Sequence, residues 1–475
     1  MDERQEYDQQ NHAALGMNYA DTEVGNRDRF VDRNKDRCLF ITETNSWVQW
    51  DGVIWKKVPQ ANIMKLADET VKSISYEART CDHPEGVSRL ATWAIKSQTK
   101  AKLEAMVSLA KHWPDLTASV REFDNNPNII NCQNGVVDLR TKELVEHHPS
   151  QKQMKTTKVA YDPSSRCPNF KAFLDSIFEG DQELISWMKK CLGYQLTGLV
   201  SEQVFFVAYG TGANGKSTLY ETIIDLLGDY AGTMQFETIL AGDKSNTRTL
   251  EAVGRLQGMR MLLASEVDSN KRLSEALIKQ LTGGDTLTGA KLYGGSYEFR
   301  PQHKINLLGN YIPQTTDTSY GMERRIMVIK FGKQFTSGER DISLPEKLKL
   351  EAEGIFAWMV EGAYLWYNEV ESRAGSSALG SCKAIDVATK SYLSDNDTLG
   401  TFLTDCTLKE PCTETSSKDL YECYTNWCHL NGETYRIPQK LFSDRLEERG
   451  YLKKRKASGY LYQCLSIKPE ASSDF

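Results

Sequence analysis

One stretch of nine residues constrains the fold of this chain more than any other. Residues 210–218 read GTGANGKST, which matches the pattern G-x-x-x-x-G-K-[S/T]. An apolar run at residues 204–209 precedes the loop, and Leu219, Ile223 and Leu226 follow it at helical spacing until Gly228. A buried strand, a glycine-rich loop and a helix in this order predict an α/β domain whose loop cradles phosphate.

Each residue type in this loop has a physical reason to be there. Glycines let the backbone turn its N–H groups toward phosphate oxygens, and the start of the following helix adds positive potential. Lys216 is long enough to reach the β and γ phosphates, and the Ser217 hydroxyl is a ligand for Mg²⁺. The predicted cofactors are ATP and Mg²⁺, and the predicted ATP-binding residues are Gly210, Thr211, Gly212, Ala213, Asn214, Gly215, Lys216, Ser217 and Thr218.

Two later apolar runs end in polar residues, as the strands of a nucleotide site do. One run leads to Glu266 and the other to Asn310. Glu266 is predicted to polarise the attacking water and, with Ser217, to hold the metal. Many ATPases end this strand with two adjacent acids, whereas Ser265 takes the first place here and Asp268 is a second candidate for the magnesium role.

The order of these segments resembles superfamily 3 helicases, specifically the phage- and plasmid-type primase-helicases to which poxvirus proteins are related. The resemblance covers residues from about 26 to 370. It implies an AAA+-like motor that forms a ring, with a hexamer expected, and it makes Asn310 the sensor that holds the γ-phosphate and the attacking water together. Arg324 and Arg325 match the arginine-finger segment, which in a ring comes from the neighbouring subunit. The sequence does not decide between them, so the predicted catalytic set is Lys216, Glu266, Asn310, Arg324 and Arg325.

Residues 286–300 alternate around Gly294 and Gly295, which predicts a hairpin with a tight turn. In the family that the chain resembles, such a hairpin projects into the pore of the ring. Lys291 is then the candidate for phosphate contact and Tyr293 the candidate for base stacking. An ordinary surface hairpin is the alternative, because paired glycines often mark only a turn.

Composition and periodicity divide the chain into four parts. Residues 1–25 are predicted to be a disordered arm, and residues 26–160 an α+β accessory domain that begins with small antiparallel strands. Residues 161–375 would hold a helical collar and the ATPase domain, which ends in one helix over residues 344–370. Residues 376–475 combine a linker with two helices and a hairpin, an order that resembles a winged helix.

The predicted C-terminal hairpin carries a run of basic residues beside tyrosines. Its candidates for DNA binding are Lys453, Lys454, Arg455 and Lys456. Such a run can equally be a solvated strand edge that resists aggregation.

The remaining composition sets limits on the class of protein. The net charge of −6 makes nucleic-acid binding less expected without excluding it, since a ring needs only local basic groups in its pore. The eleven cysteines lack paired spacing and are expected to be reduced thiols. No apolar run approaches the roughly 20 residues of a membrane helix, and no secretory signal is visible, so a cytoplasmic location is expected, in a bacterial host if a phage or plasmid encodes the chain.

These observations predict an ATP-dependent DNA helicase of a phage, prophage or plasmid replication system that translocates on single-stranded DNA. Its expected partners are single-stranded and forked DNA, further copies of itself, and a separate primase or polymerase. Only about 25 residues precede the accessory domain, so primer synthesis is not expected from this chain. The alternatives are a nucleotide-switched origin-binding ATPase and a P-loop small-molecule kinase, because the loop alone fits both.

Overall fold

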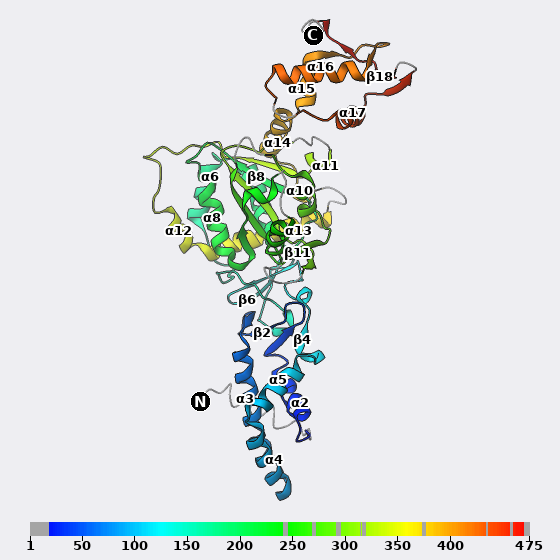
Figure 1. The fold of residues 1–475 in the computed structure, drawn as a ribbon. Helices are drawn as coiled ribbons and strands as arrows, with labels where there is room; N and C mark the ends of the chain where they lie inside the picture. The colour runs from blue at the N-terminus through cyan, green and yellow to red at the C-terminus, as the bar shows by residue number, and fades with distance from the viewer. Residues whose placement is uncertain are drawn as a thin grey trace.

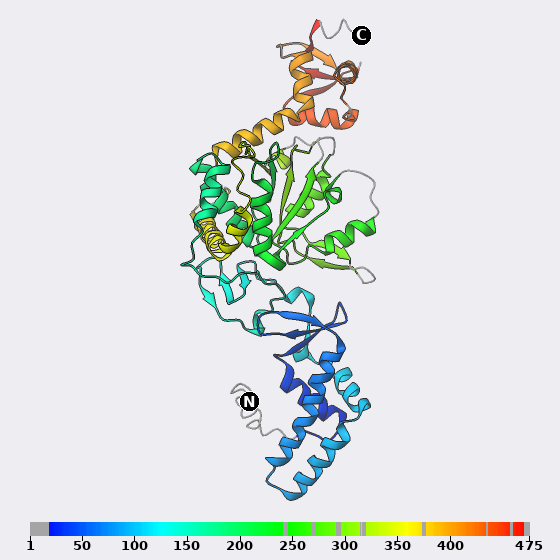
Figure 2. The same ribbon diagram turned by 90° about the vertical axis from the view of Figure 1, so that its left-hand side faces the viewer.

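The computed structural model describes residues 19–240, 246–267, 272–290, 296–313, 315, 320–372, 377–433, 436–456 and 459–469. Three bodies follow one another along the molecule: an N-terminal body of helices and a small sheet, a central α/β body and a C-terminal body (Figure 1, Figure 2). The predicted mixed α/β class is confirmed. The predicted domain limits remain predictions, and the packing below shows which segments share a core.

The N-terminal body contains four helices and one four-stranded sheet of order β3-β2-β1-β4 in the described part of the chain. Trp47 and Trp55 are buried in it. Its elements are α2 (Glu23–Asn34), β1 (Cys38–Ile41), β2 (Ser46–Trp50), β3 (Trp55–Val58), α3 (Gln60–Arg79), α4 (Pro84–Ser97), α5 (Lys100–Ala110), η1 (Pro114–Leu116), β4 (Thr117–Ala118) and η2 (Val120–Glu122).

The first helix, α2, corrects the sequence-based prediction for this region. The Thr22 side chain accepts a hydrogen bond from the Gly25 N–H and starts the helix inside the predicted arm. The helix continues to Asn34, so the strands expected from Arg29 begin only at β1. Its buried face includes polar residues that are hydrogen-bonded, such as Asn26 to Ser97 at 3.0 Å, and this hides the apolar period from sequence inspection.

A three-stranded meander links the N-terminal and central bodies. It consists of β5 (Ile129–Cys132), β6 (Gly135–Asp138) and β7 (Leu144–Val145), followed by η3 (Pro149–Gln151). Strands β6 and β7 form a hairpin in which Val136 pairs with Val145. Ile130 and Val137 share a hydrophobic cluster with α7 and α13 of the central body, so the meander packs with that body.

The central body is built on a five-stranded parallel sheet of order β14-β8-β13-β10-β9. Helices cover both faces of this sheet (Figure 2). The elements are α6 (Pro168–Ile177), α7 (Gln182–Leu196), β8 (Phe205–Tyr209), α8 (Lys216–Leu227), η4 (Gly228–Tyr230), β9 (Ala231–Thr233), η5 (Phe236–Ile239), α9 (Asn246–Gly254), β10 (Met261–Val267), α10 (Glu275–Thr282), β11 (Leu287–Ala290), β12 (Ser296–Phe299), β13 (Lys304–Gly309), α11 (Tyr320–Glu323), β14 (Ile326–Lys330), α12 (Leu344–Leu350) and α13 (Ala352–Ser372).

The single helix predicted over residues 344–370 is wrong in one respect, because it is divided between α12 and α13 at Glu351. The Glu351 carboxylate accepts hydrogen bonds from the backbone N–H groups of Asn169 (3.0 Å) and Phe170 (2.9 Å). It therefore satisfies two of the free donors at the start of α6. The break in one helix stabilises the first turn of another.

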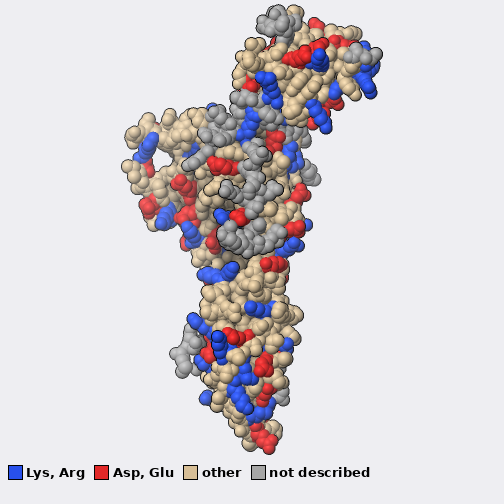
Figure 3. Space-filling model, in the orientation of Figure 1, with Lys and Arg blue, Asp and Glu red and all other residues tan. Residues whose placement is uncertain are grey.

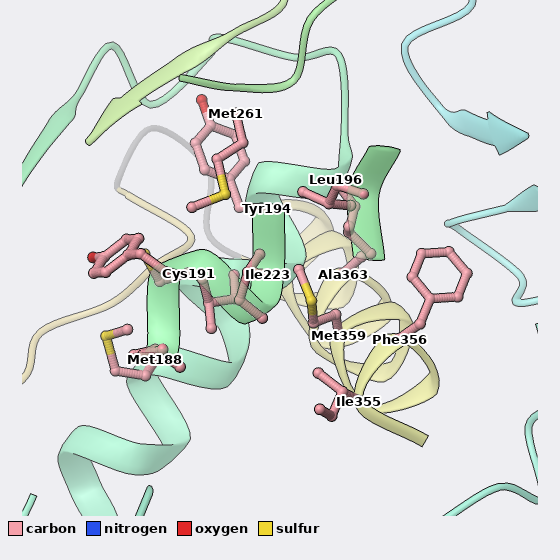
Figure 4. Packing of buried hydrophobic residues seen from close by; sticks show 14 of the residues in the cluster. Met188, Cys191, Tyr194, Leu196, Ile223, Met261, Ile355, Phe356, Met359 and Ala363 are labelled. Carbon is pink, nitrogen blue, oxygen red and sulfur yellow. The ribbon is translucent and has the colours of Figure 1, made fainter. Parts of the chain in front are cut away.

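The core of the central body lies where α7 crosses α13 (Figure 4). Met188, Tyr194 and Met359 are fully buried there. The two backbones approach so closely that a Cβ on Gly193 would lie 2.1 Å from the Ala363 nitrogen, and one on Gly362 would lie 2.0 Å from the Lys189 oxygen. Both positions therefore require glycine. Among the helices of the described residues, none combines the length and apolarity needed to cross a membrane.

The C-terminal body has its own hydrophobic cluster around Phe402, Tyr424 and Phe442. The predicted order of two helices and a hairpin is confirmed by α16, α17 and the pair β17–β18, but two further helices that were not predicted, α14 and α15, precede them. Strand β16 joins the hairpin in a sheet of order β16-β18-β17. Helix α14 (Lys383–Asp395), whose buried residues join the hydrophobic clusters of the central body, leads into this body. The elements of the body are α15 (Thr398–Cys406), β15 (Thr407–Leu408), β16 (Glu414–Ser416), α16 (Ser417–Leu430), α17 (Gln439–Glu448), β17 (Lys453–Lys456), β18 (Gly459–Gln463) and β19 (Ser466–Ile467).

Candidate nucleotide site

The glycine-rich loop connects β8 to α8, as predicted. Gly212 and Gly215 have positive φ angles of 51° and 79°, which glycine adopts without strain. Gly210 has no room for a side chain, since a Cβ there would lie 2.4 Å from the carbonyl oxygen of Phe331. The loop is fixed from outside by the Phe335 N–H, which donates to the Ala213 carbonyl at 2.8 Å.

The loop fits an anionic group. Lys216 begins α8, and its buried ammonium donates to the carbonyl oxygens of Gly309 (2.5 Å) and Gly210 (3.4 Å). Burial lowers the pKa of Lys216, as expected for an ammonium removed from water. The N–H groups of the first turn have no acceptor within the helix, although the Lys216 N–H donates to the Asn214 amide oxygen at 3.3 Å. The Asn214 amide nitrogen is buried without a hydrogen-bond partner among the described residues. An anion at this position would satisfy these donors.

The order of the sheet brings the other predicted residues toward this loop. Strand β13 lies directly between β8 and β10. The carboxyl ends of parallel strands meet at one edge of a sheet, so Asn310 and Glu266 both lie at the ends of strands near the loop. Asn310 is exposed immediately after Gly309, whose carbonyl accepts the bond from Lys216. The loop lysine therefore contacts the residue that directly precedes the candidate sensor.

Strand β10 has an irregular end at the candidate acid. Ala264 pairs with Leu307 but Val267 pairs with Gly309, so one extra residue is accommodated between them. A bulge of this kind redirects side chains. It falls at Ser265 and Glu266, the positions where the chain departs from the usual pair of acids. The side chain of Glu266 and all of Asp268 lie outside the described residues.

The two candidate finger residues lie at the opposite edge of the sheet. They precede β14, whose first residue Ile326 pairs with Phe205 at the beginning of β8. The length of β8, about 3.3 Å per residue, separates them from the loop of their own chain. Arg324 is exposed, whereas the Arg325 guanidinium is part-buried and donates to the Gly321 carbonyl at 2.5 Å.

The predicted central hairpin is present, because β11 and β12 pair antiparallel with Leu287 opposite Phe299. Tyr297 is half-buried and its hydroxyl donates to the Gly254 carbonyl at 2.5 Å, which fixes the base of the hairpin to α9. Lys291 and Tyr293 lie outside the described residues, so their contacts with DNA remain predictions.

The basic strand β17 holds two lysines in ion pairs and presents its other two basic side chains to solvent. The Lys456 ammonium lies 2.5 Å from Glu414, and that of Lys453 lies 3.4 Å from Glu447. Lys454 and Arg455 are exposed, and the Arg455 guanidinium lies 5.9 Å from the ring centre of Tyr460. Lys and Arg side chains gather at the end of the C-terminal body where β18 lies (Figure 3).

Two parts of the chain match known family models. Residues 27–179 match the family model described as D5 N terminal like, and residues 394–471 match the model described as Poxvirus D5 protein-like. A parallel α/β body between these two regions is the arrangement that the motifs predicted. These matches confirm the resemblance to the poxvirus-related primase-helicases that the sequence indicated.

Relatives in large DNA viruses agree with this assignment. The protein named "Putative helicase L207/L206" of Acanthamoeba polyphaga mimivirus is 30% identical over 220 residues, covering 46% of this chain and 23% of the relative. "Putative primase C962R" of African swine fever virus (strain Badajoz 1971 Vero-adapted) is 22% identical over 332 residues, covering 66% of this chain and 34% of the relative. The chain thus spans about a quarter of the first relative and about a third of the second. The solved apo structure of the NrS-1 C terminal region covers 90% of this chain at 12% identity with a TM-score of 0.48.

Proposed function

We propose that this chain is an ATP-dependent DNA helicase of superfamily 3 with a P-loop, AAA+-like motor. It would assemble as a hexameric ring, translocate on single-stranded DNA and serve replication of a virus, phage or plasmid. The observation that carries the proposal is the contact between the Lys216 ammonium and the Gly309 carbonyl. It joins the phosphate loop to the strand that ends at Asn310, beside the strand that carries Glu266.

The residues of the chain divide the chemical work between them. Lys216 and the first-turn N–H groups of α8 would hold phosphate oxygens, because an anionic phosphate is a stronger acceptor for the ammonium than the neutral carbonyls that it contacts. Glu266 would accept the proton of the attacking water, while the Asn310 amide orients that water. Bound Mg²⁺ supplies neutralisation of phosphate charge, and Ser217 and Glu266 are the proposed residues that hold it.

The arginine finger is proposed to be Arg324 acting on the neighbouring subunit. Its position at the far edge of the sheet places it away from its own loop, and its exposure leaves it accessible to another chain. Arg325 is instead bonded to the Gly321 carbonyl, which assigns it to the local structure. A guanidinium at the subunit boundary would neutralise charge that develops on the phosphate.

The DNA contacts are proposed to come from two places. Lys291 and Tyr293 of the β11–β12 hairpin would meet the strand inside the ring, and the C-terminal body would act as a winged-helix-like domain through Lys454 and Arg455. The presence of the C-terminal body favours a motor or an origin-binding ATPase over a small-molecule kinase, because a kinase needs no additional domain with a basic hairpin.

The proposal is tested by ATP hydrolysis and forked-duplex unwinding with Lys216→Ala. Its matched control is Lys158→Ala. This change removes a surface lysine that forms an ion pair with Asp225, a residue of the helix α8 that Lys216 begins. Lys216→Ala should reduce hydrolysis by at least about 100-fold, because electrostatic contacts to the transferred phosphate contribute several kcal/mol. The control should behave as wild type. Full hydrolysis by a normally folded Lys216→Ala protein would refute the assignment of the nucleotide site.

The finger is tested by mixing inactive subunits. Arg324→Ala subunits mixed with Lys216→Ala subunits should regain part of the activity, because some boundaries then join an intact loop to an intact arginine. The same mixture with Arg325→Ala should not regain it, since the loss of the bond to Gly321 is internal to one chain. Confirmed mixed assembly without recovery for Arg324→Ala would exclude a finger supplied in trans.

A further inference from the structure

Helix α14 leads from the central body into the C-terminal body (Figure 1) and contacts β14, the strand at one edge of the five-stranded sheet. The Val328 N–H of edge strand β14 donates to the Thr389 hydroxyl at 3.0 Å, so the helix supplies an acceptor to this edge of the sheet. Ala388 and Tyr392 are buried in the same hydrophobic cluster as Val328. The helix is therefore an integral part of the motor core and more than a linker.

The end of α14 holds the segment that follows the candidate sensor Asn310. The Tyr392 hydroxyl, on a side chain that is 4% exposed, donates to the Pro313 carbonyl at 2.7 Å. The Asn396 amide oxygen accepts from the Thr315 N–H at 3.3 Å, and its nitrogen donates to the Tyr392 carbonyl at 2.8 Å. Two residues near one helix end thus fix the backbone three and five residues beyond Asn310.

The same segment is held on its other side by the phosphate loop. The Lys216 ammonium bonds to the Gly309 carbonyl, one residue before Asn310. Tyr209, the last residue of β8, is also close to the end of α14. Burial, and secondly the charge of Asp395 at that helix end, raise the pKa of Tyr209. The exposed amide of Asn310 is accordingly placed by a bond to the loop before it and by bonds to α14 after it.

We call the contacts of Tyr392 with Pro313 and of Asn396 with Thr315 the sensor joint. The residue that follows Asn396 connects this joint to the C-terminal body. The Asp397 carboxylate accepts from the Gly400 N–H at 3.0 Å and begins α15. It also forms an ion pair with Arg449 at the end of α17. A displacement of the C-terminal body would therefore act directly on the helix end that holds Pro313 and Thr315.

We infer that Tyr392 and Asn396 are positioning residues that set the sensor Asn310 and couple the ATP site to the C-terminal body. The inference rests on the proposed function for the role of Asn310, while the bonds themselves do not. Neither residue would touch nucleotide. Their loss should impair the chemical step and leave ATP binding intact, since the phosphate loop and Lys216 are unchanged.

The first experiment compares Tyr392→Phe with Tyr421→Phe. Tyr421 is a matched control because its hydroxyl also donates to a backbone carbonyl, that of Ile437, at 3.0 Å within the C-terminal body. Tyr392→Phe should lower kcat about five- to tenfold, equivalent to about 1 to 1.4 kcal/mol, with KM and the Kd of a fluorescent ATP analogue within about twofold of wild type. Tyr421→Phe should leave all three unchanged.

The second experiment compares Asn396→Ala with Asn431→Ala. Both asparagines follow a helix and donate to the carbonyl four residues earlier, Asn431 to Trp427 at 2.9 Å, but only Asn396 also accepts from the sensor segment. Asn396→Ala should reproduce the decrease in kcat and Asn431→Ala should not. Unchanged kcat in both sensor-side variants, a change in KM alone, or an equal decrease in the controls would each overturn the inference.

Amide hydrogen exchange separates this inference from the proposed function. Without nucleotide, peptides that cover residues 305–313 should exchange faster in Tyr392→Phe than in wild type or Tyr421→Phe, because the bond to Pro313 restrains that backbone. If Tyr392→Phe exchanges faster but the wild-type protein hydrolyses no ATP, the structural role of Tyr392 is supported and the proposed reaction is rejected. Unchanged exchange would reject the joint whatever the activity.

Discussion

Burial of His303 should make the free energy of unfolding of this protein depend on pH. The ring lies just before β13 with 2% of its surface exposed, and neither ring nitrogen has a hydrogen-bond partner among the described residues. Its neighbour Lys304 is also buried, with its ammonium on the carbonyls of Thr197, Leu199 and Gln302. Burial, and secondly the charge of Lys304, lower the pKa of His303 from 6.5 to about 3.

The sign of the effect follows from proton binding. In the unfolded chain the imidazole takes a proton below pH 6.5, whereas in the folded chain it stays neutral until about pH 3. Acid therefore favours the unfolded chain, and the stability present above pH 6.5 is lost progressively between these two values. At about 1.4 kcal/mol per pH unit, lowering the pH from about 6.5 to about 5 should cost about 2 kcal/mol, a large part of the roughly 5–15 kcal/mol that stabilises a typical protein.

Replacement of His303 with Met removes the titrating group and keeps a side chain of similar volume. Urea unfolding followed by circular dichroism at about pH 7 and pH 5 should show a pH effect smaller by about 2 kcal/mol in His303→Met than in wild type. His112→Met, which changes an exposed ring, should retain the wild-type effect. Groups common to all three proteins cancel in the comparison. An equal pH effect in wild type and His303→Met would refute the reasoning.

Three further predictions concern the motor. Glu266→Gln should bind ATP and fail to hydrolyse it, which an accumulation of nucleotide-bound protein in filter binding would show; normal turnover would move the role to another acid such as Asp268. Lys291→Ala should keep DNA-independent ATP hydrolysis and lose unwinding. The slope of log affinity for single-stranded DNA against log salt should also become shallower, by up to about 0.7 for each phosphate that the variant no longer neutralises. An unchanged slope would place the pore contact elsewhere. Lys454→Ala should weaken DNA binding in the same assay and Lys456→Ala, already paired with Glu414, should weaken it less, so an equal weakening would argue against a role for Lys454.

Local patterns were sufficient for most elements of the central body. The loop, its flanking strand and helix, and the strands that lead to Glu266 and Asn310 were predicted because burial on both faces of a parallel sheet produces continuous apolar runs. Helix α2 was missed because residues such as Arg29 lie on its buried face, where an ion pair with Glu77 satisfies the guanidinium. An apolar period cannot reveal a helix whose buried side chains are polar and paired.

Interactions between distant segments were beyond the sequence. Tyr392 and Pro313 are 79 residues apart, and no local pattern distinguishes this tyrosine from any other buried aromatic on a helix. The choice between Arg324 and Arg325 was likewise open, because adjacent arginines have the same chemistry. Only the fold shows that one is exposed and that the other is bonded to the Gly321 carbonyl.

The positions of the phosphate loop and Arg324 at opposite edges of the sheet support the proposed assembly of this chain as a ring. The phosphate loop and Asn310 lie at the carboxyl edge of the strands, whereas Arg324 precedes β14 and lies at the amino edge. If the arginine completes a site, that site must belong to another copy, and the interface joins two different surfaces. A head-to-tail interface leaves one unused surface at each end, so it either closes into a ring or extends as a filament. Closure gives every subunit a complete site, which is the state that a motor with one finger per boundary requires.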